Sequence, residues 1–171
     1  MRKRIFILFS LIILATIAGC ENSSESKRWK ASPTFTIPIT FGDGTEGEYR
    51  LIGTKGKIGF LIGSGNKGKS EEMPIVANKT NKYMWFIWGD GDPISGNFKV
   101  VGLNWNGKKH PVLVTGNKEV WEYPNISVSS NNGAVSQIPS NMVFPTSGLW
   151  QLKVYFNDRL FEEIVIDVKD K

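Results

Sequence analysis

The chain has 171 residues, a formal net charge of +5 and a single cysteine, Cys20. This length fits one domain, and a single cysteine excludes a disulfide within the chain, so the core must stabilise the fold. Three of the 21 basic residues are Arg2, Lys3 and Arg4, and the other 18 stand against 16 acidic residues. The remainder is nearly neutral, which argues against a nucleic-acid partner because such surfaces carry a clustered basic face.

The first twenty residues have the pattern of a secretion signal. An uncharged apolar run at residues 5–17 follows the basic start and is shorter than the roughly 20 residues of a spanning helix. We therefore expect residues 1–19 to be a cleaved signal peptide. Ile17, Ala18, Gly19 and Cys20 resemble the lipobox of bacterial lipoproteins. This resemblance implies that Cys20 carries diacylglycerol and anchors the protein to the cell membrane on its extracytoplasmic face.

Residues 20–32 are mostly polar and predict the lipidated cysteine with a flexible tether, and residues 33–171 predict one folded domain. Clusters of Gly, Asn, Asp and Pro divide this domain into short apolar or alternating runs, which is typical of an antiparallel all-β protein. We expect a single immunoglobulin-like β-sandwich. Its predicted strands are residues 34–41, 49–52, 57–62, 83–88, 97–103, 111–115, 149–156 and 160–168.

Two of these strands allow finer expectations. Residues 83–88 are apolar at positions of both parities, so we expect a central strand that is covered on both faces. The last two strands flank Asn157-Asp158 and predict a terminal hairpin. A two-residue turn would place Leu152 opposite Glu163, whereas a three-residue bulged turn would pair it with Ile164; we favour the bulged turn.

The segment Gly63-Ser64-Gly65-Asn66-Lys67-Gly68-Lys69-Ser70 matches the pattern of a phosphate-binding loop and follows an apolar strand. Such a loop must open a helix whose N-terminal amides hold the phosphates. Pro74 follows too soon for a useful helix. We therefore expect a glycine-rich hairpin loop and no nucleotide.

No constellation of residues predicts catalysis or a metal site. His110 is the only histidine, so a His-based triad or metal cluster has no second member. Asp90 and Asp92 could offer two carboxylates, but the distal ligand of a calcium loop is missing. We expect no enzyme activity, no cofactor and no metal.

The tryptophans divide into two groups. Trp85 and Trp150 lie in apolar predicted strands and are expected in the core, where an aromatic ring buries a large apolar area. Trp105 and Trp121 lie among polar residues. They are the candidate contacts for a ligand or partner such as an envelope protein, peptide or glycan.

Three blocks of sequence, at residues 81–89, 131–140 and 145–150, resemble an uncharacterised family of Gram-positive lipoproteins, the domain of unknown function 4871. They comprise a tryptophan-rich strand, an Asn-Gly loop and a turn containing Pro145, Gly148 and Trp150. The resemblance spans most of residues 33–168 and implies an immunoglobulin-like sandwich. It implies no reaction and no catalytic residue.

We therefore expect a lipid-anchored surface module that binds a partner without catalysing a reaction. One alternative is an inhibitory or sensory lipoprotein whose closing hairpin docks on an envelope protein. A less favoured alternative is an envelope hydrolase that uses carboxylates such as Asp90 and Asp92.

Overall fold

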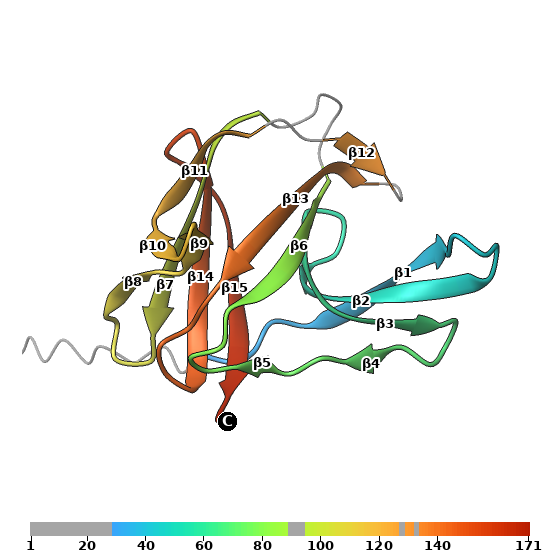
Figure 1. Cartoon of the computed structure of the whole chain (residues 1–171), viewed down its shortest axis with the longest axis horizontal. Coiled ribbons are helices and arrows are strands. Elements are labelled where there is room, and N and C mark those ends of the chain that lie inside the picture. Colours follow the sequence, from blue (N-terminus) through green and yellow to red (C-terminus); the bar gives the residue numbers. More distant parts are fainter. Residues whose placement is uncertain (1–28, 89–94, 127–128, 132–133) are drawn as a thin grey trace, which may run out of the picture.

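The computed structural model describes residues 29–88, 95–126, 129–131 and 134–171. These residues form strands and connections with no helix, which confirms the all-β class (Figure 1). The strands are β1 (Thr34–Thr40), β2 (Glu46–Thr54), β3 (Ile58–Asn66), β4 (Glu71–Glu72), β5 (Ile75–Val76), β6 (Asn81–Ile87), β7 (Gly96–Asn104), β8 (Lys109–Pro111), β9 (Leu113–Thr115), β10 (Lys118–Val120), β11 (Glu122–Ile126), β12 (Ser129–Asn131), β13 (Ala134–Met142), β14 (Gly148–Phe156) and β15 (Arg159–Lys169).

The strands form two sheets. The larger sheet has the order β1-β2-β3-β6-β13-β9-β10, with β4 beside β3 and β12 beside β13. The smaller sheet has the order β11-β7-β14-β15-β5, with β8 beside β7. Only β5 and β15 pair in parallel among the described strands. The immunoglobulin-like assignment stays a prediction, whereas the two-sheet all-β architecture is observed.

The expected central strand is confirmed. The β6 strand lies between β3 and β13, and its residues Trp85, Phe86 and Ile87 are all buried. Trp85 belongs to the main core between the sheets. Phe86 points to the other face of its sheet and packs in a second apolar cluster with Ile37 and Leu51. This second cluster explains why residues of both parities are apolar in β6.

The β13 strand was not predicted, although it is nine residues long and pairs with β6. Its even-numbered residues from Ser136 to Met142 are buried, but Ser136 and Ser140 interrupt the apolar pattern. Pro139 also argued against a strand. Pro139 is exposed. On the side of β13 away from β6, no described strand pairs with Pro139, so its missing N–H breaks no ladder.

The run predicted as one strand at residues 111–115 is divided between the two sheets. The β8 strand pairs with β7 in the smaller sheet, whereas β9 pairs with β10 and β13 in the larger sheet. The buried residue between them, Val112, is where the chain crosses from one sheet to the other. Sequence periodicity does not reveal such a crossing, because both halves remain extended.

The terminal hairpin has the predicted pairing but a different turn. Leu152 lies opposite Ile164, as we expected. The turn itself has two residues, Asn157 and Asp158, with φ angles of 47° and 62° that suit a type I′ turn. The irregularity lies inside the ladder, between Val154 and Tyr155. The favoured three-residue turn was therefore wrong, and a bulge two residue pairs from the turn shifts the register in the same way.

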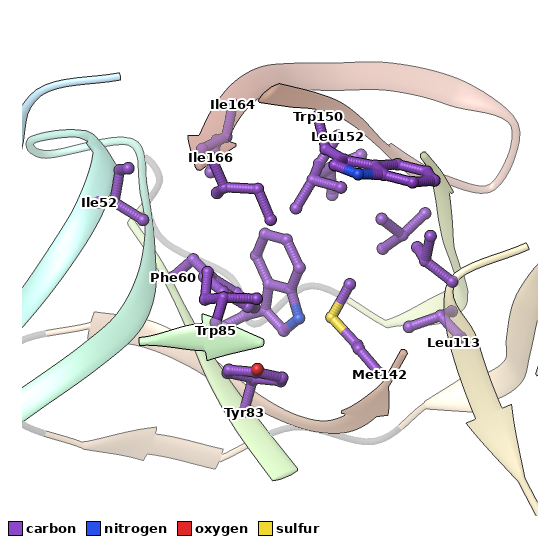
Figure 2. Close-up of a cluster of buried hydrophobic side chains, with 14 of the residues drawn as sticks. Ile52, Phe60, Tyr83, Trp85, Leu113, Met142, Trp150, Leu152, Ile164 and Ile166 are labelled. Atoms are coloured by element: carbon purple, nitrogen blue, oxygen red, sulfur yellow. The ribbon is translucent and has the colours of Figure 1, made fainter. Parts of the chain in front are cut away.

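The main core lies between the two sheets. Figure 2 shows the Trp85 indole at the centre of this core, with Leu152, Ile164 and Ile166 of the smaller sheet on one side. Phe60 lies against the indole, with ring centroids 4.6 Å apart, and Phe98 of the smaller sheet approaches its edge at 5.7 Å. Burial of these large side chains supplies the main stabilisation of a domain without a disulfide.

Polar contacts join the two sheets and attach the N-terminal segment to β15. The Tyr123 hydroxyl, on β11 of the smaller sheet, donates to the carbonyl oxygen of Val114 on β9 of the larger sheet at 2.8 Å. The Ser32 N–H donates to the Val165 carbonyl at 2.8 Å, and the Ser32 hydroxyl accepts the Val165 N–H at 2.9 Å. Ser32, counted above in the tether, is thus bound to β15.

Candidate binding surface

Several residues singled out in the sequence lie outside the described residues. They include the signal segment at residues 1–19, the lipidation residue Cys20 and the carboxylates Asp90 and Asp92. The lipid anchor and the hydrolase alternative that invokes these carboxylates therefore stay predictions.

The glycine-rich segment at residues 63–70 is a hairpin loop, as expected. Gly63 and Ser64 of β3 pair with Glu72 and Glu71 of β4. A Cβ atom on Gly63 would lie 2.1 Å from the carbonyl oxygen of Glu71, so this glycine is required by the close approach of the two strands. No helix follows the loop, and a helix is the element on which a phosphate-binding loop depends.

The last residue of that segment, Ser70, has a structural role. It is buried, and its hydroxyl donates to the Glu48 carboxylate at 2.5 Å. The Arg50 guanidinium donates to the Ser70 carbonyl oxygen at 3.2 Å. The hydrogen bond from the Ser70 hydroxyl to the Glu48 carboxylate is the main cause that lowers the pKa of Glu48. The loop is thus attached to β2.

His110 lies in β8, opposite Gly102 of β7. Its ring packs against the Trp150 ring in a T-shaped arrangement, with centroids 5.2 Å apart. Its Nε2 atom is buried with no hydrogen-bond partner. Over the described residues, no group of three His, Cys, Asp or Glu side chains could hold a metal ion. His110 therefore packs against the core in this structure.

The structure separates the tryptophans as expected. Trp85 and Trp150 are fully buried, whereas Trp105 is 72% exposed and Trp121 is 43% exposed. The two exposed rings do not form one platform. The Trp121 carbonyl accepts the N–H of Val100 in the middle of β7, whereas Trp105 follows the end of that strand. Five residues of extended chain separate these points by about 16 Å.

Trp121 lies where the chain passes from one sheet to the other. It connects β10, at the end of the larger sheet, to β11, at the end of the smaller sheet. Beside it is an open hollow of about 560 Å³, lined by Lys99, Glu119, Val120, Trp121 and Glu122. An exposed aromatic surface with carboxylates and an ammonium around it can stack on a ligand and also form hydrogen bonds.

Lys99 contributes a positive charge to the lining of this hollow. Its ammonium is 2.9 Å from the Asp158 carboxylate at the turn of the terminal hairpin and lies 5.7 Å from the centre of the Tyr155 ring. The hydrogen bond to Asp158 and the charge of that residue raise the pKa of Lys99. The cation is thus held between the hollow and the hairpin. Glu122 is its cross-strand neighbour on β11.

The surface has further hollows that were not predicted, and two of them carry exposed apolar side chains. One, of about 350 Å³, is lined mainly by residues of the N-terminal segment, the β4–β5 connection and the end of β15, including the 59% exposed Met73. The other, also of about 350 Å³, lies at the tip of the terminal hairpin beside Leu160, which is 52% exposed. Sequence alone could not find the first, because it joins segments far apart in the chain.

The sequence pattern of a known family matches residues 21–166, which include both sheets and the Trp121 hollow. That family is the domain of unknown function DUF4871. This chain belongs to the DUF4871 family. No curated protein matches the chain.

A solved structure gives independent support for the fold of this DUF4871 protein. It is the crystal structure of a Bacillus anthracis protein described as a "Putative Lipoprotein", with a TM-score of 0.60 and 23% identity. The match covers 82% of this chain and 86% of the other. Similarity at this level shows a shared fold. Within the described residues of this chain, no helix is long and apolar enough to cross a membrane.

Proposed function

We propose that this DUF4871 protein is a lipid-anchored, extracytoplasmic lipoprotein with an immunoglobulin-like sandwich, and that it binds a partner without catalysing a reaction. The lipobox at residues 17–20 supports the anchor, and the B. anthracis structure described as a lipoprotein agrees with it. We assign Cys20 as the lipid attachment site. The signal peptide would deliver the domain to the outer face of the cell membrane.

The observation that carries the binding role is the exposed Trp121 at the edge of its hollow. The Trp121 side chain is 43% exposed, so part of its apolar area is in contact with water. A ligand that covers the ring removes this area from water. Lys99, Glu119 and Glu122 supply one donor group and two acceptor groups around the ring. This chemistry suits a glycan or a peptide, both of which combine flat apolar faces with hydrogen-bonding groups.

The test measures the fluorescence of the full-length protein in detergent during titration with soluble cell-wall glycan fragments and with peptides from cell-wall digests. We expect a saturable change for one of the two ligands. Trp121→Ala should reduce the affinity at least tenfold. Trp105→Ala is the matched control and should keep the affinity. If Trp105→Ala alone weakens binding, the contact lies at Trp105, beyond the C-terminal end of β7. If neither ligand binds, this assignment is overturned.

The anchor has its own test. Intact mass of the protein purified from a Gram-positive host should show a chain that begins at Cys20 and carries a diacylglycerol adduct. Cys20→Ala should remove the adduct and block processing. A chain that retains Met1 overturns the anchor and leaves the Trp121 assignment standing.

One observation favours a second function, in which the terminal hairpin docks on an envelope protein as an inhibitor or sensor. Leu160 is 52% exposed at the hairpin tip, beside the hollow lined by Phe156 and Phe161. Exposed apolar groups beside a hollow are typical of contact sites. Leu160→Asp should abolish capture of a protein partner in this case, and should leave binding of glycan fragments unchanged.

A further inference from the structure

One end of the molecule gathers the exposed Trp105, the first described residues, the C-terminal residues and several lysines. Trp105 follows β7, and its ring lies 3.8 Å from where a Cβ of Gly148 would be. Gly148 begins β14 and pairs with Val168, near the C-terminal end of β15. The Ala77 N–H donates to the carbonyl of the next residue, Lys169. The β7–β8 turn and the C-terminus accordingly lie together at the lower edge of Figure 1.

The N-terminal segment enters the domain at this same end. Ser32 is bound to Val165 of β15, and the preceding residue, Ala31, lines a hollow together with Asp167 and Lys169. Read from Ser32 towards the N-terminus, the chain thus runs along β15 towards its last residues. We call the surface formed by residues 29–31, 77–80, 105–109 and 167–171 the tether end.

The tether end is positively charged. Asp167 and Asp170 are its acidic side chains, and Asp167 forms an ion pair with Lys169. Its lysines, all of them exposed, are Lys30, Lys79, Lys108, Lys109, Lys169 and Lys171. Lysines near a membrane are attracted to anionic lipid headgroups, and tryptophan side chains favour the interface between headgroups and hydrocarbon.

The length of the tether is compatible with contact. Eight residues separate Cys20 from Trp29, so the chain can span at most about 30 Å between the lipid and the domain. A domain held this close meets the bilayer repeatedly, and local attraction then sets its orientation.

We infer that the tether end lies on an anionic bilayer, with Trp105 in the headgroup region and the lysines over lipid phosphates. This inference rests on the proposed lipid at Cys20. The Trp121 hollow, about 16 Å further along β7, then remains clear of the membrane and open to a partner. The two exposed tryptophans would have different tasks, one at the membrane and one at the ligand.

The test uses the lipidated full-length protein in vesicles. Lipidation blocks the thiol of Cys20, so an introduced cysteine is the only free thiol and can carry a nitroxide label. Asn106→Cys places the label in the β7–β8 turn beside Trp105. Arg159→Cys places it at the tip of the terminal hairpin, at the opposite end of the nine-residue strand β14. Both positions are exposed.

In vesicles with 30% phosphatidylglycerol, we expect the label at position 106 to become accessible to oxygen. It should be at least threefold less accessible to a nickel chelate than the label at position 159. The label at position 159 should remain accessible to nickel. Protection at position 106 should fall in pure phosphatidylcholine and in 1 M NaCl. Adding Lys108→Ala and Lys109→Ala should remove it, whereas the control pair Lys67→Ala and Lys69→Ala should not. Melting temperatures check that each variant folds.

Vesicle flotation and the mass of the N-terminal peptide separate the two ways of failing. A protein without the lipid adduct overturns the anchor and, with it, this inference. A lipidated protein that floats with the vesicles, but whose label at position 106 is as accessible to nickel as that at position 159, overturns only the orientation.

Discussion

The indole N–H of Trp85 donates to the hydroxyl oxygen of Ser140 at 2.9 Å, inside the main core. Trp85 is 0% exposed and Ser140 is 2% exposed. The bond joins β6 to the unpredicted strand β13. A buried indole N–H needs a partner, because an unsatisfied donor retains its full desolvation penalty. The serine that disrupts the apolar pattern of β13 thus satisfies the largest side chain at the centre of the core.

Ser140→Ala should lower the free energy of unfolding by about 1–3 kcal/mol, because the Trp85 N–H then remains buried without a partner. Urea unfolding monitored by circular dichroism measures this change. Ser64→Ala on the exposed surface of β3 is the control and should cost less than about 0.5 kcal/mol. Equal costs for the two variants would show that the bond contributes nothing.

Gly63→Ala should destabilise the protein by about 1–3 kcal/mol, since the added methyl group meets the Glu71 backbone and must displace β4 from β3. Gly42→Ala is the matched control. A Cβ on Gly42 would meet no atom within 4 Å, and its φ angle is not positive. Thermal unfolding of both variants provides the comparison. A Gly63→Ala protein as stable as Gly42→Ala would contradict the close strand approach.

Ser70→Ala should raise the pKa of Glu48 towards that of a free glutamate, because the Ser70 hydroxyl is the main group that lowers it. The sign follows from linkage. A carboxyl whose pKa is lower in the folded state stabilises the fold above its unfolded pKa, near 4.3, and this contribution is lost as the pH falls through the folded pKa. NMR titration of the Glu48 carboxyl carbon measures the shift. An unchanged pKa in the variant would assign the effect to other groups.

ATP with magnesium at millimolar concentration should leave the melting temperature of the wild-type protein unchanged. The glycine-rich segment forms a hairpin between β3 and β4, and no helix follows it to hold a phosphate. Lys69→Ala should behave like the wild type in this assay. A stabilisation by ATP that disappears in Lys69→Ala would restore the nucleotide-binding interpretation.

Local sequence patterns predicted the class of fold and the positions of most long strands. Apolar residues of both parities around Trp85 predicted a central strand, and the Asn157-Asp158 pair predicted the terminal hairpin. The expected pairing of Leu152 with Ile164 was confirmed, although the expected turn length was wrong. Polar surroundings correctly distinguished the exposed Trp105 and Trp121 from the buried Trp85 and Trp150. These features are local, because the two-residue period of a strand and the turn preference of a residue pair are encoded by neighbours in the chain.

The pairing of distant segments could be learned only from the folded structure. The burial of Ser140 is explained only by its hydrogen bond with Trp85. The presence of Pro139 in a strand is explained only by the absence of a second described strand paired with it. The division of residues 109–115 between two sheets, and the separation of Trp105 from Trp121, also depend on contacts between distant segments. The burial of a polar residue can be explained only when its hydrogen-bond partner is known, since that hydrogen bond offsets the cost of burial. The partner's position belongs to the fold and is invisible in the local pattern.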